Sequence, residues 1–119
     1  MKKYRLTNKT ITVTRNGKEV TLHRIEALRD FGDIKAGDLG GYVESEANLS
    51  HDGDCWVGDK ARIYDNAKIF GNALVYDNAE VYGNAKVYGE TEVFGNAWVY
   101  GSAVVYGMDK VCGDTELST

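Results

Sequence analysis

Aliphatic side chains recur at every sixth residue through most of this chain. The series runs without a slip through Val57, Ile63, Ile69, Val75, Val81, Val87, Val93, Val99, Val105, Val111 and Leu117. A small residue, most often Ala, stands two positions before most of them, and Gly or Asp follows two positions after all but the last. Residues six apart do not share one face of a helix, so the repeat argues against an amphipathic helix.

Short strands joined by corners explain the six-residue unit. Residues two apart on a strand share a face, so the small and the aliphatic residue both point inward. Gly, Asp and Asn tolerate the positive φ that a sharp corner needs. Three such sides close a coil, and stacked coils lie roughly 4.8 Å apart, the spacing of paired strands. The sequence therefore predicts an all-β fold, a triangular parallel β-helix of about four coils over residues 36–119, with three aliphatic ladders inside.

The first 35 residues have a different pattern. Residues 10–14 and 19–23 alternate apolar and polar side chains around Asn16-Gly17, the strongest short signal for a β-hairpin. A two-residue turn at Asn16-Gly17 pairs Val13 with Val20 and Ile11 with Leu22. We interpret residues 1–35 as a β cap over the first coil and residues 36–119 as the hexapeptide-repeat β-helix, together one structural unit. Residues 50–54 form the only bulge expected in the coils.

Charge divides along the same boundary. Residues 1–35 carry nine Lys or Arg and four Asp or Glu, whereas residues 36–119 carry five and fourteen. The acidic body argues against direct nucleic-acid binding, which depends on basic side chains at phosphates. An acidic nucleic-acid mimic is an alternative function, although Lys68 and Lys86 interrupt its negative surface.

The cellular location follows from what the sequence lacks. It has no apolar run of 18 residues and no apolar stretch after its basic start, so we expect neither a membrane span nor a secretory signal. Cys55 is expected inside the coil and Cys112 outside, three coils apart and too distant for a disulfide. Two unpaired thiols fit the cytoplasm.

Aromatic residues follow the inward aliphatic in eight consecutive repeats, and they point outward. They form three expected stacks, Tyr64/Tyr82/Tyr100, Phe70/Tyr88/Tyr106 and Tyr76/Phe94. Such stacks either stabilise a flat sheet or serve as a contact surface, because aromatic residues dominate interface hot spots. Trp56, Leu74 and Trp98 add to the outward apolar surface. The face with Trp56 and Leu74 is the most apolar and the best candidate for packing between subunits.

Catalytic chemistry has one weak candidate. His51 lies in the bulge beside Asp52 and Asp54, where a carboxylate could orient an imidazole as a general base, although such a run is also ordinary turn chemistry. His23 is expected to be a cross-strand residue of the hairpin. Two histidines do not supply the three that a zinc site of the carbonic-anhydrase type needs. Asp59, Asp65 and Asp77 replace Gly at corners, so turn chemistry explains them better than calcium does. We expect no metal and no cofactor.

Several segments resemble a known family. They are Lys3-Tyr4-Arg5-Leu6, residues 30–37, Gly40-Gly41-Tyr42-Val43, Leu49-Ser50 and Gly53-Asp54-Cys55-Trp56. Together they are similar to the opening of the YdcK-like left-handed β-helix proteins, over roughly residues 1–67. The resemblance implies left-handed coiling and a transferase-like fold.

The sequence favours a non-catalytic binding or scaffold protein that works through its outward aromatic faces. We expect a homo-oligomer, with an unidentified protein or small molecule as its external partner. A phage or mobile-element accessory inhibitor is a role that suits such a compact module. A hexapeptide-type acyltransferase with His51 as its base is the alternative from another class. The last coil carries no cap, so we expect either a two-fold end-to-end contact there or side-by-side trimer packing.

Overall fold

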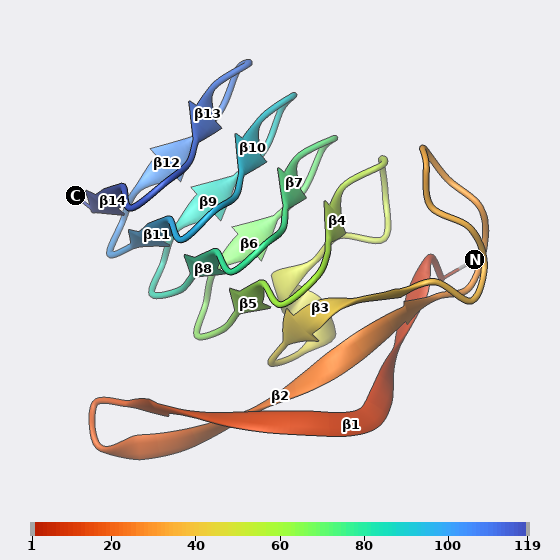
Figure 1. The fold of residues 1–119 in the computed structure, drawn as a ribbon, viewed down its shortest axis with the longest axis horizontal. Coiled ribbons are helices and arrows are strands. Elements are labelled where there is room, and N and C mark those ends of the chain that lie inside the picture. Colours follow the sequence, from red (N-terminus) through yellow and green to blue (C-terminus); the bar gives the residue numbers. More distant parts are fainter. Residues whose placement is uncertain (1, 119) are drawn as a thin grey trace.

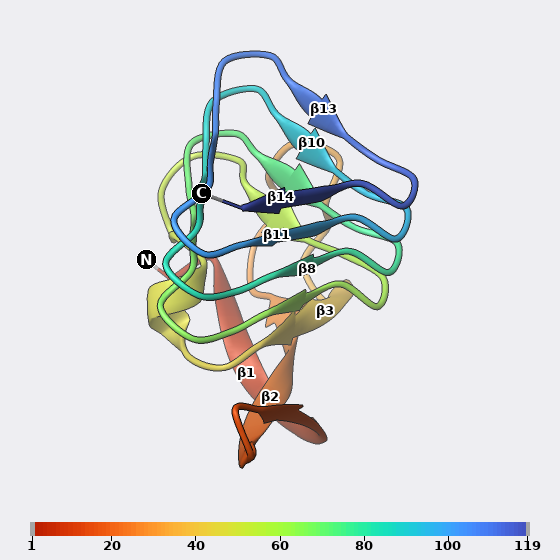
Figure 2. The same cartoon turned by 90° about the vertical axis from the view of Figure 1, so that its left-hand side faces the viewer.

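The chain folds as a parallel β-solenoid of about four turns in the computed structural model, which describes residues 2–118. The successive coils stack along one axis (Figure 1), and the view from the C-terminal side shows them lying one behind another (Figure 2). The coil strands are β4 (Trp56–Val57), β5 (Arg62–Ile63), β6 (Lys68–Ile69), β7 (Leu74–Val75), β8 (Glu80–Val81), β9 (Lys86–Val87), β10 (Glu92–Val93), β11 (Trp98–Tyr100), β12 (Val104–Val105), β13 (Lys110–Val111) and β14 (Glu116–Ser118). The all-β class and the solenoid predicted from the repeat are confirmed.

The three predicted aliphatic ladders are present. Strands β4, β7, β10 and β13 form one sheet, β6, β9 and β12 a second, and β5, β8, β11 and β14 belong to a third. Val57 pairs with Val75, which pairs with Val93, and the paired residues of strands β4 to β14 are 18 apart in the sequence. The inward Val and Ala side chains of the middle coils are fully buried. One continuous apolar core therefore runs through the coils.

The corners need residues with a positive φ. Asp65 and Asp77 have φ values of 58° and 59°, and Gly83 has a φ of 69°. Each of these Asp carboxylates also accepts a hydrogen bond from the next coil, since Asp65 Oδ2 lies 3.1 Å from the Gly83 amide and Asp77 Oδ2 lies 3.1 Å from the Gly95 amide. The corner aspartates thus link neighbouring coils, which explains their position without a bound cation.

The first 35 residues contain the predicted hairpin. β1 (Tyr4–Arg15) pairs antiparallel with β2 (Lys18–Ala27), with Val13 opposite Val20 and Ile11 opposite Leu22. β2 pairs with β3 (Leu39–Val43), and β3 continues into the sheet of β5, so seven strands form one sheet. A short 3-10 turn, η1 (Glu46–Asn48), follows β3.

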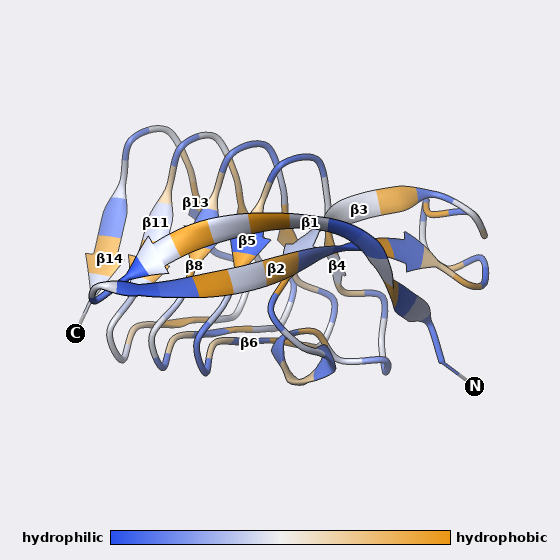
Figure 3. Cartoon of the chain, turned by 90° about the horizontal axis from the view of Figure 1, so that it is seen from below, coloured by the Kyte–Doolittle hydropathy of each residue, from blue (hydrophilic) through white to orange (hydrophobic). Residues whose placement is uncertain are grey.

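The hairpin has two parts with different neighbours. Tyr4 and Ile25, from its base, are fully buried in the main core beside the first coil. Its free half extends along the length of the solenoid (Figure 3) and packs on the outside of the coils, forming a second apolar cluster around Leu22. Within residues 2–118, no helix has the length and apolar character needed to cross a bilayer.

Candidate functional site

The outward aromatic rings stack between coils in all three predicted series. Ring centroids are 5.0 Å apart for Tyr64 and Tyr82, 4.7 Å for Phe70 and Tyr88, and 5.1 Å for Tyr76 and Phe94. The ring planes of these pairs are within 10° of parallel. The stacks continue to Tyr100 and Tyr106.

Carboxylates hold several of these rings in place. The Tyr76 hydroxyl donates to Glu92 Oε1 at 2.6 Å, and the Tyr64 hydroxyl donates to Glu80 Oε1 at 2.9 Å. Burial, together with the neighbouring Glu92, raises the pKa of Tyr76 to about 12. These tyrosines therefore stay protonated at neutral pH and form rigid, uncharged surfaces.

The hairpin covers part of the Tyr64/Tyr82/Tyr100 stack. Tyr64 is only 5% exposed because Leu22 and neighbouring hairpin residues pack on it. The Arg15 guanidinium lies 4.9 Å from the centre of the Tyr82 ring, and Arg15 Nε lies 2.8 Å from Asp65 Oδ2. Trp98 belongs to the same sheet, between Glu80 and Glu116, and remains 42% exposed. The chain itself thus occupies the first rungs of this face.

Trp56 and Leu74, grouped together by the sequence pattern, have different surroundings. Trp56 is 5% exposed because the Phe31 ring packs edge-on against it at 5.3 Å. Leu74, its neighbour on β7, is 37% exposed. The segment around Phe31 therefore covers the first rung of this face and leaves the second open.

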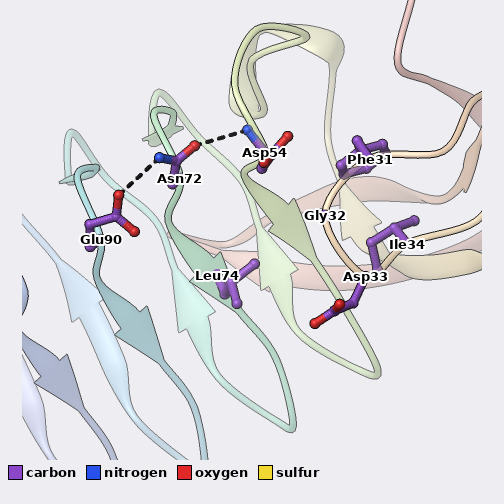
Figure 4. Close-up of a pocket in the computed structure, with 8 residues that line it drawn as sticks. All are labelled: Phe31, Gly32, Asp33, Ile34, Asp54, Asn72, Leu74 and Glu90. Carbon is purple, nitrogen blue, oxygen red and sulfur yellow. Dashed lines mark hydrogen bonds between the residues drawn. The ribbon is translucent and has the colours of Figure 1, made fainter.

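A pocket of about 300 Å³ lies at the boundary between that segment and the open face (Figure 4). Its lining comprises Phe31, Gly32, Asp33, Ile34, Asp54, Asn72, Leu74 and Glu90. Asn72 connects two walls: its Oδ1 accepts from the Asp54 amide at 3.1 Å, and its Nδ2 donates to Glu90 Oε1 at 3.0 Å. Apolar side chains and three carboxylates thus surround one opening.

Sequence reasoning did not identify this pocket. One wall comes from residues 31–34, where Phe31 and Ile34 form an isolated antiparallel bridge around a tight turn. The positive φ of Gly32, 50°, is the local feature that makes the turn possible. The Gly32-Asp33 pair signals a turn, but nothing in the sequence shows that this turn lies beside Leu74.

The third aromatic stack, Phe70/Tyr88/Tyr106, becomes more exposed toward the last coil. Phe70 and Tyr88 are half-buried, whereas Tyr106 is 57% exposed beside the exposed Val104. Phe70, Tyr88 and Tyr106 belong to neither apolar cluster of the described chain, so residues 2–35 do not cover them there.

His51 uses both ring nitrogens within the protein. Nδ1 lies 3.0 Å from the Lys3 backbone nitrogen and accepts a hydrogen bond from that N–H, so the neutral imidazole carries its proton on Nε2. Nε2 in turn lies 2.8 Å from Glu46 Oε1, and the ring stacks on Tyr4 at 4.2 Å. The carboxylate that contacts His51 is therefore Glu46 rather than Asp52 or Asp54. A general base needs a free lone pair toward its substrate, and here the Lys3 amide occupies that lone pair.

Lys3 is a buried cation that connects the start of the chain to the bulge. Its Nζ lies 2.7 Å from the Cys55 carbonyl oxygen, 3.2 Å from that of Gly53 and 3.3 Å from Cys55 Sγ. Burial lowers the pKa of Lys3 and raises the pKa of the Cys55 thiol. Cys55 is buried and Cys112 exposed, as predicted, and both are free thiols. The bulge at residues 50–54 thus anchors the N-terminal segment.

Comparison with known proteins supports the resemblance found in the sequence. The family model described as YdcK Beta solenoid repeat matches residues 93–107. The chain is 37% identical over 67 residues to a protein of Escherichia coli (strain K12) named "Uncharacterized acetyltransferase YdcK". The match covers 53% of this chain and 21% of that relative, so the chain spans only a small part of the relative's length. The similarity to YdcK-like solenoids is confirmed.

Proposed function

We propose that this chain is a non-catalytic binding module whose ligand enters the pocket beside Leu74. The observation that carries the proposal is the lining of that pocket, which combines the apolar side chains of Phe31, Ile34 and Leu74 with the carboxylates of Asp33, Asp54 and Glu90. A concave site with an apolar lining and a few charged groups is the usual form of a binding pocket.

The lining favours a positively charged group on an apolar stem, such as a Lys or Arg side chain of a partner protein. None of the eight lining residues is basic, so no side chain of the lining forms an ion pair with these carboxylates. Leu74 of the pocket lining stands two residues before Tyr76, whose stack with Phe94 extends the contact surface for a larger partner. The free thiols Cys55 and Cys112 fit the reducing cytoplasm as the place where this binding occurs.

Acyl transfer is the second candidate, favoured by the printed name of the E. coli relative. His51 is the residue that would act as the base. Its two ring nitrogens already contact the Lys3 amide and Glu46, and its ring stacks on Tyr4. This arrangement supports a role in attaching the N-terminal segment rather than in proton transfer.

A titration with small amides tests the binding proposal. We expect N-acetyl-arginine amide to shift the backbone NMR signals of Asp54, Asn72 and Leu74, and N-acetyl-glutamine amide to leave them unchanged. Glu90→Gln should weaken binding several-fold, whereas Glu116→Gln, on another face, should not. Equal shifts with both amides, or shifts elsewhere only, would refute the site.

An acyl-transfer assay separates the two candidates. The wild-type chain and His51→Ala are each incubated with an acyl thioester and a mixture of amines. We expect no transfer above the uncatalysed rate from either protein. Transfer by the wild type that is lost in His51→Ala would replace the binding proposal with the enzymatic one.

A further inference from the structure

β1 forms one margin of the seven-stranded sheet. It is the terminal strand in the sheet order, so its second edge pairs with no other strand of the described chain. The stretch Thr10–Thr14 alternates exposed threonines at positions 10, 12 and 14 with Ile11 and Val13, which pack toward the Leu22 cluster. This edge is separate from the pocket beside Leu74.

The hairpin register determines which backbone groups the edge presents. Asn16 and Gly17 have φ values of 54° and 77°, as the two-residue turn requires. The residues flanking such a turn, Arg15 and Lys18, form a hydrogen-bonded pair, and the bonded pairs then alternate along the ladder. Val13 and Ile11 therefore exchange their bonds with β2. The amide and carbonyl groups of Thr10, Thr12 and Thr14 point away from it.

Features that usually protect an edge strand, such as a bulge or a charged side chain, flank this stretch but do not occur within it. The register of β1 shifts between Leu6 and Thr10, and the Lys9 amide there donates to Thr7 Oγ1 at 3.2 Å. At the other end, the salt bridge to Asp65 holds Arg15. Between them lie no proline, no charged side chain and no bulge. An open edge of this kind is a template for another strand.

We propose that the strand added there is β1 of a second copy of this chain, paired antiparallel with Thr12 opposite Thr12 on a two-fold axis. In this register Thr10 lies opposite Thr14 of the second copy, so every outward backbone group of the stretch meets a complementary group. Ile11 lies opposite Val13, and the two Leu22 clusters become neighbours across the axis. The surface is self-complementary, as a two-fold dimer requires.

Placing the two-fold axis at another residue of β1 does not give a complete set of hydrogen bonds between the two strands. Centring the pair on Ile11 or Val13 uses amide groups that already pair with β2. Centring it on Thr10 runs into the shifted segment before it, and centring it on Thr14 runs into the Asn16-Gly17 turn. In the proposed register Lys9 lies opposite Arg15 of the second copy, whose charge Asp65 already balances at 2.8 Å. A single short strand pair buries little surface, so the dimer is weak and forms with increasing concentration.

Sedimentation of the wild type and two variants at residue 12 tests this dimer. Thr12→Pro removes the amide on the two-fold axis, which does not pair with β2, and proline is tolerated on an edge strand at such a position. Thr12→Val keeps the amide and is the matched control. We expect wild type and Thr12→Val to dimerise as concentration rises, and Thr12→Pro to stay monomeric with an unchanged circular dichroism spectrum.

A charge pair tests the register without altering the backbone. Thr10→Lys with Thr14→Glu places opposite charges across the two-fold axis, whereas Thr10→Lys with Thr14→Lys places like charges there. We expect the first double variant to dimerise at least as tightly as wild type and the second to be monomeric. A wild type that stays monomeric at all concentrations, or two double variants with equal dimer affinity, would overturn the proposal. Loss of the dimer in Phe94→Glu would instead place the interface on the aromatic face.

Discussion

Tyr64 and Tyr106 hold the same position in the repeat and have opposite surroundings. Each follows an inward aliphatic residue, and each stacks on an aromatic one coil away. Tyr64 is 5% exposed and Tyr106 is 57% exposed. The difference is the N-terminal hairpin, which packs on the face that holds Tyr64 and Tyr82, whereas Tyr106 lies on another face, beside the sheet of β6, β9 and β12. A repeat position therefore sets the direction of a side chain, whereas exposure depends on what covers that coil.

The same contrast holds on the pocket face. Trp56 and Lys110 occupy equivalent positions at the two ends of one sheet. Phe31 covers the first, and the second is exposed. The first coils are held by contacts that occur once, such as those of His51 and Lys3, while the later coils rely on contacts that recur in every turn.

The largest expected effect comes from truncating the covered tyrosine. Tyr64→Ala removes a buried ring and its bond to Glu80, so it should lower the free energy of unfolding by about 3 kcal/mol. Tyr106→Ala removes an exposed ring at the end of a stack and should cost less than about 1 kcal/mol. Urea denaturation measures both. Equal losses would show that the hairpin does not determine the difference.

A smaller effect should separate the hairpin from the coils it covers. Arg15→Gln and Asp65→Asn each break the salt bridge between half-buried side chains, and Arg15→Gln also removes the contact with Tyr82. In a double-mutant cycle we expect a coupling of about 0.5–1 kcal/mol that decreases with added salt. Zero coupling would mean that the bridge does not hold the hairpin in place.

The smallest effect concerns pH and the attachment of the first coil. The hydrogen bond from His51, followed by that from Lys2, lowers the pKa of Glu46. Because the folded pKa is lower than the unfolded one, this carboxylate stabilises the fold above the ordinary glutamate pKa of about 4.3 and loses that contribution as pH falls through the folded value.

Glu46→Gln should therefore be slightly less stable at neutral pH and lose less stability between neutral pH and about pH 3 than wild type. Thermal melts across this range measure the difference, with the exposed hairpin variant Glu19→Gln as the control. Identical pH profiles for wild type and Glu46→Gln would remove Glu46 from the attachment of the N-terminal segment.

Most of the fold follows from local pattern, while the candidate site does not. The ladder of Val57, Val75 and Val93 and the pairing of Val13 with Val20 are evident from spacing and from one Asn-Gly turn. The pocket needs residues 31–34 to lie beside Leu74, and the role of His51 needs the Lys3 amide at its Nδ1. Neither contact has a signal in the spacing of residues.

The residue pattern alone specifies the solenoid, its inward and outward positions, the aromatic stacks and the hairpin. Each depends on backbone preferences and side-chain periodicity within one short unit, repeated along the chain. The exposure of individual aromatic rings, the place of the pocket and the contacts of the His51 nitrogens arise only when the chain is folded. Those properties rest on single contacts between distant residues, such as Lys3 with His51, 48 positions apart, and Arg15 with Asp65, 50 apart. Such contacts depend on how the N-terminal segment packs against the completed coils.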